Sequence, residues 1–521
     1  MKYTIALTGA SGNMGRETLK ELMNSPVVEK VKILCLNTPE DKKFVKAQKK
    51  LFKGRIEASF GDLSVLDDCE KLVDGADYLL HLAAVIPPHS DHRPDLAVKC
   101  NLYGTRNLLE CLKKRPDIKF VHISTVAVYG HRNYRHPWGR VGDPLLPSVY
   151  DVYAQSKMIA EREVMESGLA HWAVLRQTAM LHNNMMKDNM KDGLMFHTTL
   201  NVPLEWVTAE DSGYLMRRIV ERDAAGEIDD FWRRCYNIGG GAANRYTGYD
   251  TFNEGFKMIG GSTELFIQPK WCSVRNFHGL WFADSDELDE MFKYQRQSVK
   301  DFWGQILSRH RYYSLAKGIS PKIIRKFAIE RLLSDENAPL KWIKNGEAGK
   351  VKAYFGSADN IDCLSEGWKY YPVLAKGQIA DGNINYDDLK DIKFAKENGI
   401  LLDHGFDETK SLDKISLDDL KSAAALRGGK CLAESFKDLY TPVEWECAEG
   451  HRFSMSPYTV LFGGHWCSEC VKLGEWNFDK YAKSNPFYAS VWYDSHAKAE
   501  NTKYYFVDGK PCYTTYDEVY A

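Results

Sequence analysis

Short apolar runs alternate with amphipathic stretches along the first part of the chain. The stretches at 15–24 and 102–114 repeat their apolar positions with helical spacing, whereas the runs between them have the length of buried strands. Strands that alternate with helices form a parallel sheet covered on both faces, so the pattern predicts a doubly wound α/β domain. The predicted strands are 3–8, 31–36, 78–82 and 119–124.

The pattern changes near residue 300 to mixed, aromatic-rich helical sequence. Residues 308–333 carry seven Lys or Arg and a single acid, Glu330. We expect a solvated helix pair that links two domains, and the alternative is a helix that docks on a membrane surface or a partner. Farther on, 415–431 has the pattern of a helix ended by Gly428 and Gly429.

These patterns predict three parts in a chain too long for one core. The parts are an α/β domain at 1–300 with a small substrate subdomain mainly at 177–300, a helical linker at 301–345, and a C-terminal domain at 346–521 with a compact module at about 428–475.

Composition narrows the function classes. Hydrophobic residues make up 44% and charged residues 27% of the 521 residues, and the net charge is −2, which gives no bulk attraction to nucleic acid or anionic membranes. The first strand pattern runs directly into a glycine-rich turn, without the apolar region of a signal peptide. No apolar run approaches the roughly 18 residues of a membrane span. We expect a cytoplasmic protein, compatible with a homodimer.

A glycine-rich turn follows the first predicted strand. In TGASGNMG, Gly9, Gly12 and Gly15 lie between that strand and the next helix. Glycine lets the backbone turn tightly and approach a pyrophosphate, which the free N–H groups of a helix N-terminus stabilise. The turn therefore predicts a dinucleotide site.

This turn, with GDL at 61–63, HLAA at 81–84, NLYGTRNLLEC at 101–111 and ISTVAVYG at 123–130, resembles the extended short-chain dehydrogenase/reductase superfamily over about residues 1–300. The resemblance implies a Rossmann-type sheet and a nicotinamide cofactor. It implies cofactor contacts for Thr8, Gly9, Ser11, Gly12, Asn13, Met14, Gly15, Asn37, Asp62, Leu63, Leu82, Ala83 and Ala84, together with Tyr153 and Lys157.

The choice between NAD and NADP normally depends on the end of the second strand, where an acid binds the ribose or an arginine accepts the 2′-phosphate. Asn37 stands there, so neither signal is present. Lys42 and Lys43 are close enough in sequence to reach a phosphate, although Glu40 and Asp41 offset them. We favour NADP over NAD.

A tyrosine and a lysine are spaced for acid–base chemistry in YDVYAQSK. Tyr153 precedes Lys157 by four residues, which puts both on one helix face, whereas Tyr150 lacks that spacing. A nearby ammonium favours the phenolate, so Tyr153 is predicted to exchange a proton with a substrate hydroxyl or carbonyl. By resemblance, Thr125 is the catalytic hydroxyl that binds the substrate oxygen.

The predicted substrate region is apolar. LRQTAMLHNNMM departs from the LRPxNVYGP-like segment of enzymes that act on nucleotide sugars, and 178–206 is rich in methionine and aromatics, with Lys187 and Lys191 as its evident bases. We expect an alcohol/ketone pair on an apolar molecule, similar to the hydroxysteroid dehydrogenase and flavonoid reductase side of the superfamily. The alternatives are a nucleotide-sugar epimerase or dehydratase and a non-catalytic nucleotide sensor. His278 and Trp281 could face the substrate, and for His278 we expect a packed side chain instead.

Four metal-ligand residues stand near the C-terminus. Cys447, His451, Cys467 and Cys470 form two short-spaced pairs that can close a tetrahedral zinc site with no open position, so the zinc is predicted to be structural. The surrounding segment resembles zinc-ribbon or treble-clef modules, in which Cys431 and His465 are not ligands. Acids match its few bases, so nucleic acid is not an expected partner.

Overall fold

The computed structural model describes residues 2–189, 191–357, 360, 364, 367–379 and 385–506. The remainder of the predicted C-terminal domain, including 507–521, lies outside the described residues.

A seven-stranded parallel sheet forms the centre of the fold, in the order β10-β7-β5-β4-β1-β2-β3. Four of its strands coincide with the predicted apolar runs, and the predicted doubly wound α/β fold is confirmed. The strands are β1 (Tyr3–Thr8), β2 (Val28–Cys35), β3 (Ile56–Phe60), β4 (Tyr78–His81), β5 (Lys119–Thr125), β7 (Trp172–Gln177) and β10 (Arg234–Ile238).

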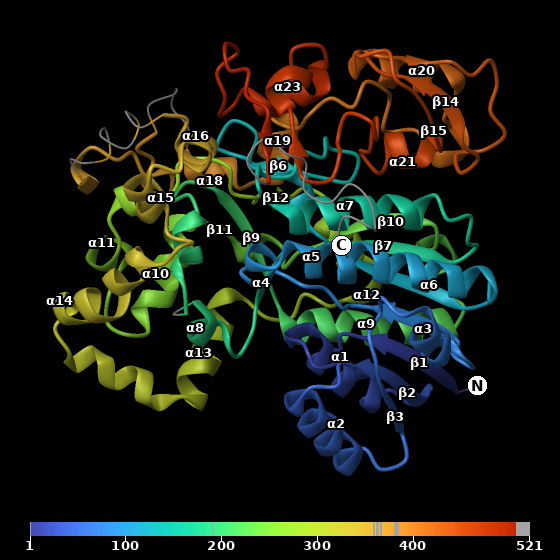
Figure 1. The fold of residues 1–521 in the computed structure, drawn as a ribbon, viewed down its shortest axis with the longest axis horizontal. Coiled ribbons are helices and arrows are strands. Elements are labelled where there is room, and N and C mark those ends of the chain that lie inside the picture. Colours follow the sequence, from blue (N-terminus) through green and yellow to red (C-terminus); the bar gives the residue numbers. More distant parts are fainter. Residues whose placement is uncertain are drawn as a thin grey trace.

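Helices cover both faces of this sheet (Figure 1). Successive residues of a strand point to opposite faces: Ile5 and Leu7 of β1 pack into one core, and Ala6 packs into the other. The first core contains α1 (Asn13–Asn24), α2 (Pro39–Leu51), α9 (Ala209–Ala224) and α12 (Ser285–Phe292), and the second contains α3 (Leu66–Val73), α6 (Gly104–Lys113) and α7 (Val152–Met165).

The strand order reverses between β1 and β4. From β1 the chain passes outward to β2 and β3, and it then returns to place β4 on the opposite side of β1. Loops that leave the carboxyl ends of these two strands diverge, which opens a crevice where doubly wound sheets bind their ligands. This position of the sheet is where a cofactor is expected.

A smaller region packs beside the carboxyl end of the sheet. It contains the three-stranded sheet β11-β9-β8 and the strand pair β12-β6. Its elements are β6 (Trp138–Gly139), β8 (Ala179–Leu181), β9 (Pro203–Thr208), β11 (Arg245–Thr247), β12 (Trp281–Phe282), α10 (Gly248–Lys257) and α11 (Thr263–Phe266).

The segment predicted as a linker forms short helical pieces that pack on this region. Phe302 and Trp303 of α13 (Val299–Arg309) and Trp342 of α15 (Pro339–Asn345) are buried. Between them lie η7 (Arg311–Gly318), α14 (Pro321–Ile324), η8 (Arg325–Ile329) and η9 (Glu330–Ser334), and α16 (Ala348–Phe355) follows. In the described part of the chain, no helix is both long and apolar enough to cross a membrane.

The C-terminal part packs against α7 and the β10 edge of the sheet (Figure 1). Tyr458 stacks edge-on against Trp172 of β7, and its hydroxyl accepts a 2.8 Å hydrogen bond from the backbone N–H of Cys235 on β10. The C-terminal part therefore satisfies an outward N–H group of an edge strand. From residue 417 onward, the C-terminal part contains α20 (Leu417–Leu426), β13 (Lys430–Cys431), β14 (Val443–Glu446), β15 (Arg452–Met455), α21 (Pro457–Leu461), β16 (Glu475–Trp476), α22 (Phe478–Tyr481), α23 (Pro486–Trp492) and β17 (Tyr504–Tyr505).

Candidate active site and metal cluster

A cavity of about 1320 Å³ lies at the reversal point of the sheet. Its wall includes the glycine turn, the loop after β4, the end of β5, the first turns of α7, and parts of the smaller region. Of the predicted cofactor residues, the wall contains Gly9, Gly12, Asn13, Met14, Gly15, Leu82, Ala84, Tyr153 and Lys157. Thr8, Ser11, Asn37, Asp62, Leu63 and Ala83 are outside the wall, and their contacts with a cofactor stay predictions.

The glycine turn is built for a close backbone approach. Gly9 has a positive φ of 69°, and a Cβ there would lie 2.7 Å from the backbone nitrogen of Ala83. A Cβ on Gly15 would lie 2.0 Å from the carbonyl oxygen of Gly9. Gly12 caps α1 without a side-chain hydrogen bond, so the first N–H groups of the helix keep their capacity for an anion. The turn has the properties that a pyrophosphate needs.

Three of the residues outside the wall have structural contacts. The Thr8 hydroxyl accepts hydrogen bonds of 3.1 Å from the backbone N–H groups of Leu82 and Ala83, so it ties the loop after β4 to β1. Leu63 packs in the core. Asp62 accepts a 2.9 Å hydrogen bond from the Ser64 N–H and lies 3.8 Å from the Lys99 ammonium.

Arg16 lies between the glycine turn and the end of β2, and the sequence reasoning missed it. Its Nε donates a 2.8 Å hydrogen bond to the carbonyl of Ser11, and its guanidinium lies 4.4 Å from the ring centre of Phe44 on α2. Its charge also acts on the pKa of the Cys35 thiol, the last residue of β2, which burial raises to about 12. An arginine directly after the third glycine was the signal in the sequence.

Thr125, Tyr153 and Lys157 all line the cavity. Thr125 ends β5, and its hydroxyl accepts a 3.2 Å hydrogen bond from the Ala127 N–H, while the Ser124 hydroxyl donates to Glu161. The Lys157 ammonium lies 3.3 Å from Nε2 of buried His122. The ends of β5 and α7 thus present a hydroxyl, a phenol and an amine to one space.

Burial controls the acidity of this group. Burial raises the pKa of Tyr153 to about 12, with hydrogen bonding to Thr125 opposing the shift and the charge of Asp151 adding to it. Burial also lowers the pKa of Lys157 to about 8. At neutral pH the tyrosine is therefore a phenol that can donate a proton, and the lysine keeps its charge.

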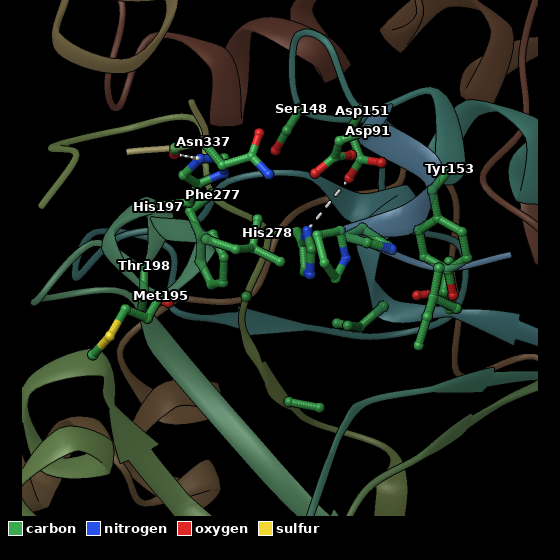
Figure 2. Close-up of a pocket in the computed structure, with 18 of the residues that line it drawn as sticks. Asp91, Ser148, Asp151, Tyr153, Met195, His197, Thr198, Phe277, His278 and Asn337 are labelled. Atoms are coloured by element: carbon green, nitrogen blue, oxygen red, sulfur yellow. Dashed lines mark hydrogen bonds and ion pairs between the residues drawn. The ribbon is translucent and has the colours of Figure 1, made fainter. Parts of the chain in front are cut away.

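The cavity has a polar end that sequence reasoning found only in part (Figure 2). Asp91, from α4 (His89–His92), lies beside Asp151, which caps α7 through a 2.8 Å hydrogen bond from the Ala154 N–H. His278 faces them, with its Nδ1 3.5 Å from the Asp151 carboxylate. Burial, and then the charge of Asp151, raise the pKa of Asp91 to about 7. We expected His278 to be packed, and it lines the cavity instead, whereas Trp281 packs against Trp138 in the core.

Much of the remaining cavity wall is apolar. Lys191 also lines the cavity and pairs with Asp188 at 2.7 Å. Residues from the C-terminal part, Tyr505 and Phe506, also reach the wall. The apolar side chains are Met180, Met185, Met186, Met195, Trp206, Phe252, Phe256 and Trp303.

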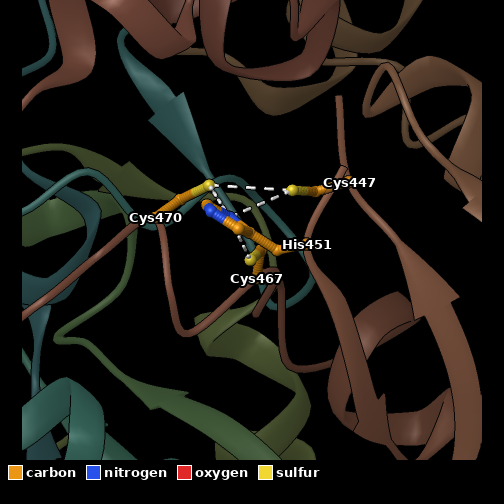
Figure 3. A group of neighbouring side chains, drawn as sticks. All are labelled: Cys447, His451, Cys467 and Cys470. Carbon is orange, nitrogen blue, oxygen red and sulfur yellow. Dashed lines mark hydrogen bonds between the residues drawn. The ribbon is translucent and has the colours of Figure 1, made fainter. Parts of the chain in front are cut away.

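The four predicted metal ligands form one cluster (Figure 3). Their ligand atoms all lie within 4.8 Å of one another. His451 Nδ1 is 3.5 Å from the Cys447 sulfur, 3.6 Å from that of Cys467 and 3.5 Å from that of Cys470. Three sulfurs and one imidazole nitrogen at these separations match the donor set of a tetrahedral zinc ion.

His465 is outside this cluster and connects its loop to α7. Its Nε2 lies 3.0 Å from a carboxylate oxygen of buried Glu161, one turn beyond Lys157. Arg176 bridges the same elements, because it pairs with Glu161 at 2.6 Å and donates a 2.6 Å hydrogen bond to the Gly463 carbonyl. The loop that carries Cys467 and Cys470 is thereby held against the helix that carries Tyr153.

Residues 5–184 match the model of the NAD dependent epimerase/dehydratase family. The chain is 37% identical to D-erythronate dehydrogenase of Haemophilus influenzae over 62 residues, which is 12% of this chain and 20% of that protein. It is 23% identical over 227 residues to 3 beta-hydroxysteroid dehydrogenase/Delta 5→4-isomerase of Vaccinia virus, which is 42% of this chain and 60% of the viral protein.

Among solved structures, the fold is similar to UDP-glucose 4-epimerase from Bifidobacterium longum in complex with NAD⁺ and UDP. The TM-score is 0.47 and the identity 16%, over 59% of this chain and 98% of that one. Each matched segment covers at most 60% of the two sequence relatives named above. Residues 5–184 therefore match the NAD dependent epimerase/dehydratase family, which agrees with the resemblance predicted for this part of the chain.

Proposed function

We propose that this chain, with its NAD-dependent epimerase/dehydratase family domain, is an oxidoreductase that interconverts a secondary alcohol and a ketone on a largely apolar molecule. The observation that carries the proposal is that Thr125, Tyr153 and Lys157 line the same cavity as the glycine turn. A dinucleotide on the turn and a carbonyl near the tyrosine would then share one enclosed space.

In this proposal the Thr125 hydroxyl and the Tyr153 phenol bind the substrate oxygen. A bound nicotinamide cofactor supplies the hydride in reduction and accepts it in oxidation. Tyr153 gives its proton to the oxygen of the ketone that is being reduced, and it takes the proton back in the reverse direction. The Lys157 ammonium stabilises the resulting phenolate. Because the phenol has a pKa of about 12, the protonated form needed for reduction dominates at neutral pH.

We propose NADP as the preferred cofactor. Arg16 lies beside the end of β2, where an arginine accepts the 2′-phosphate in sheets of this type. Lys42 and Lys43 are exposed near the start of α2, and Asp41 caps that helix together with Thr38. Asp41 keeps its negative charge near the end of β2, so the proposal depends on Arg16 and the two lysines outweighing it.

The charges of the cavity support an apolar substrate over a nucleotide sugar. Its acidic side chains, Asp91, Asp151, Asp188, Asp192 and Glu347, outnumber its basic ones, Lys157, Lys191 and Lys350. A sugar diphosphate would meet net negative charge there, whereas the methionines and aromatics suit a hydrocarbon frame. The second candidate, a nucleotide-sugar epimerase or dehydratase, is favoured by 27% identity over 128 residues to UDP-glucose 4-epimerase of Rickettsia canadensis.

A turnover screen tests this proposal. Purified protein is incubated with NADPH or NADH and with sterol ketones, flavonoids or small ketones, and the loss of cofactor absorbance is followed. Nucleotide sugars are incubated with NAD⁺ or NADP⁺ and their products are separated by chromatography, because an epimerase or dehydratase returns the cofactor to its starting state. We expect turnover of apolar ketones, its loss in Tyr153→Phe, and unchanged cofactor binding in that variant. Turnover of nucleotide sugars alone would contradict the apolar substrate, and an active Tyr153→Phe variant would contradict the role of the phenol.

We also propose a structural zinc ion for the Cys447, His451, Cys467 and Cys470 cluster. Four protein ligands fill a tetrahedral coordination sphere, so no position remains for a reacting water. Elemental analysis is expected to find about one zinc per chain. A fully folded preparation without metal would contradict the site.

A further inference from the structure

Residues 311–327 form a basic-apolar surface at the edge of the molecule. The segment comprises η7, α14 and the start of η8, and Figure 1 shows α14 at the periphery, far from the central sheet. Neither η7 nor α14 buries a single side chain. Most of this segment is therefore presented outward.

Large apolar side chains are concentrated on this surface. Five of the fourteen exposed large hydrophobic residues in the described chain lie here, although the segment is a small fraction of the sequence. They recur every three or four residues, and their exposed fractions are 59% for Tyr312, 74% for Leu315, 47% for Ile319, 52% for Ile323 and 68% for Phe327. Exposed apolar side chains gathered in this way mark a contact surface.

Residues that lie between the exposed apolar side chains anchor the segment to the rest of the protein. Tyr313 packs in a cluster with Met185, Met186 and Trp303, three residues of the cavity wall. Ile324 packs in a second cluster with Phe256 and Trp271. The exposed row is thus held on a packed base and is presented without a need for folding on contact.

The charge of the surface is uniformly positive. From 302 to 329 the sequence contains six Lys or Arg and no Asp or Glu. Arg309 pairs with Glu210 at 3.7 Å and Arg325 pairs with Glu330 at 2.9 Å. The other four, Arg311, Lys317, Lys322 and Lys326, are exposed, and among the described carboxylates the structure records no ion pair for them.

We propose that this basic-apolar surface docks on an anionic lipid bilayer. Apolar side chains interspersed with exposed Lys and Arg match an interface in which hydrocarbon lies just below negative headgroups. An acidic groove on a protein partner would match the positive charge of the surface. It would not match the five outward apolar side chains, which the hydrocarbon of a bilayer does match. Because the whole chain has a net charge of −2, the molecule as a whole is not attracted to an anionic bilayer, and the local positive patch determines which face turns toward it.

Co-sedimentation of the full chain with large vesicles tests this proposal. Binding is compared between phosphatidylcholine vesicles and vesicles that also contain phosphatidylserine, at low and at high salt. We expect binding to the anionic vesicles at low salt, weaker binding at high salt, and little binding to phosphatidylcholine alone. Each nearby Lys or Arg contributes about 1 kcal/mol, so Lys322→Gln/Lys326→Gln should weaken binding about 30-fold.

Two further variants separate the contributions. Leu315→Ser/Phe327→Ser should weaken binding to anionic vesicles without altering the salt dependence, because only apolar contact is removed. Lys49→Gln/Lys50→Gln removes two exposed charges from α2 and should leave binding unchanged. Unchanged unfolding temperatures show that each variant folds.

Three results would overturn the proposal. The first is no binding to phosphatidylserine vesicles at low salt, and the second is binding that the 315/327 and 322/326 variants retain. The third is concentration-dependent dimerisation in light scattering that these variants abolish, without vesicle binding, because the surface would then belong to a contact between two copies of the chain.

Discussion

The proposed preference for NADP rests mainly on one exposed guanidinium, so Arg16→Met is the sharpest test of it. Arg16 is held in place by the 2.8 Å hydrogen bond to Ser11 and by Phe44, 4.4 Å from its guanidinium. Methionine keeps the unbranched apolar stem and its contact with the ring, but it removes the charge. The substitution also removes the hydrogen bond to Ser11 in the glycine turn, and the affinity for NADH, which needs the turn but lacks the 2′-phosphate, shows whether the turn is kept.

The expected magnitude follows from the exposure of Arg16. A hydrogen bond to a charged group contributes about 1.5–3 kcal/mol. Because Arg16 is exposed, solvent screening puts its contact with a 2′-phosphate at the lower end of that range. A loss of about 1.5–2 kcal/mol weakens NADPH binding roughly 10- to 30-fold. NADH lacks the phosphate, so its affinity should be unchanged.

Titration calorimetry measures both affinities without a known substrate. Lys50→Met, which removes a charge from the far end of α2, is the matched control and should alter neither affinity. Equal weakening of NADPH and NADH in Arg16→Met would mean that Arg16 binds a part common to both cofactors. Tighter binding of NADH than NADPH by the unmodified protein would contradict the preference for NADP itself.

Two other predictions concern the polar end of the cavity and the metal cluster. The pKa of Asp91 is raised to about 7 from 3.8, so the folded protein holds this proton more tightly than the unfolded chain does. The contribution of Asp91 to stability therefore falls as pH rises from about 4 to 7, and the unfolding temperature of Asp91→Asn should rise relative to that of the unmodified protein over this range. The same pH dependence in both proteins would refute the shift. Cys467→Ser should abolish zinc binding and lower the unfolding temperature, whereas Cys431→Ser, which changes a buried cysteine outside the cluster, should keep the zinc. Elemental analysis measures the zinc and calorimetry the unfolding temperature. Zinc retained in Cys467→Ser would show that Cys467 is not a ligand.

Elements with a strong local signal could be predicted from the sequence. The apolar run at 3–8 coincides with β1. The three glycines after it predicted a tight turn, and a side chain at Gly9 or Gly15 would indeed collide with the backbone. The members of the Cys/His cluster were also predicted from their spacing, because a short loop joins the two residues of each pair. In each case the residues that interact are close in the chain or belong to a pattern with one geometry.

The polar end of the cavity could not be predicted in the same way. Asp91 and Asp151 belong to segments 60 positions apart, and their approach depends on how the loop after β4 passes over the start of α7. His278 reaches them from a third segment. A lone histidine among aromatics has no periodic signal, so the reasoning that favoured a packed residue had no information about the direction of its ring.

The contacts between residues most distant in the sequence join the C-terminal module to the α/β domain. Glu161 lies on the buried face of α7, where a charge is costly unless it is paired and hydrogen-bonded. Arg176 of β7 supplies one partner, and His465, which is 304 positions after Glu161 in the chain, supplies another. Without the module, both the Glu161 carboxylate and the Arg176 guanidinium lose a partner one turn below Lys157. The module therefore completes the support of the helix that carries Tyr153, and a metal bound to Cys467 and Cys470 would stabilise the proposed catalytic site through this loop without contacting the substrate.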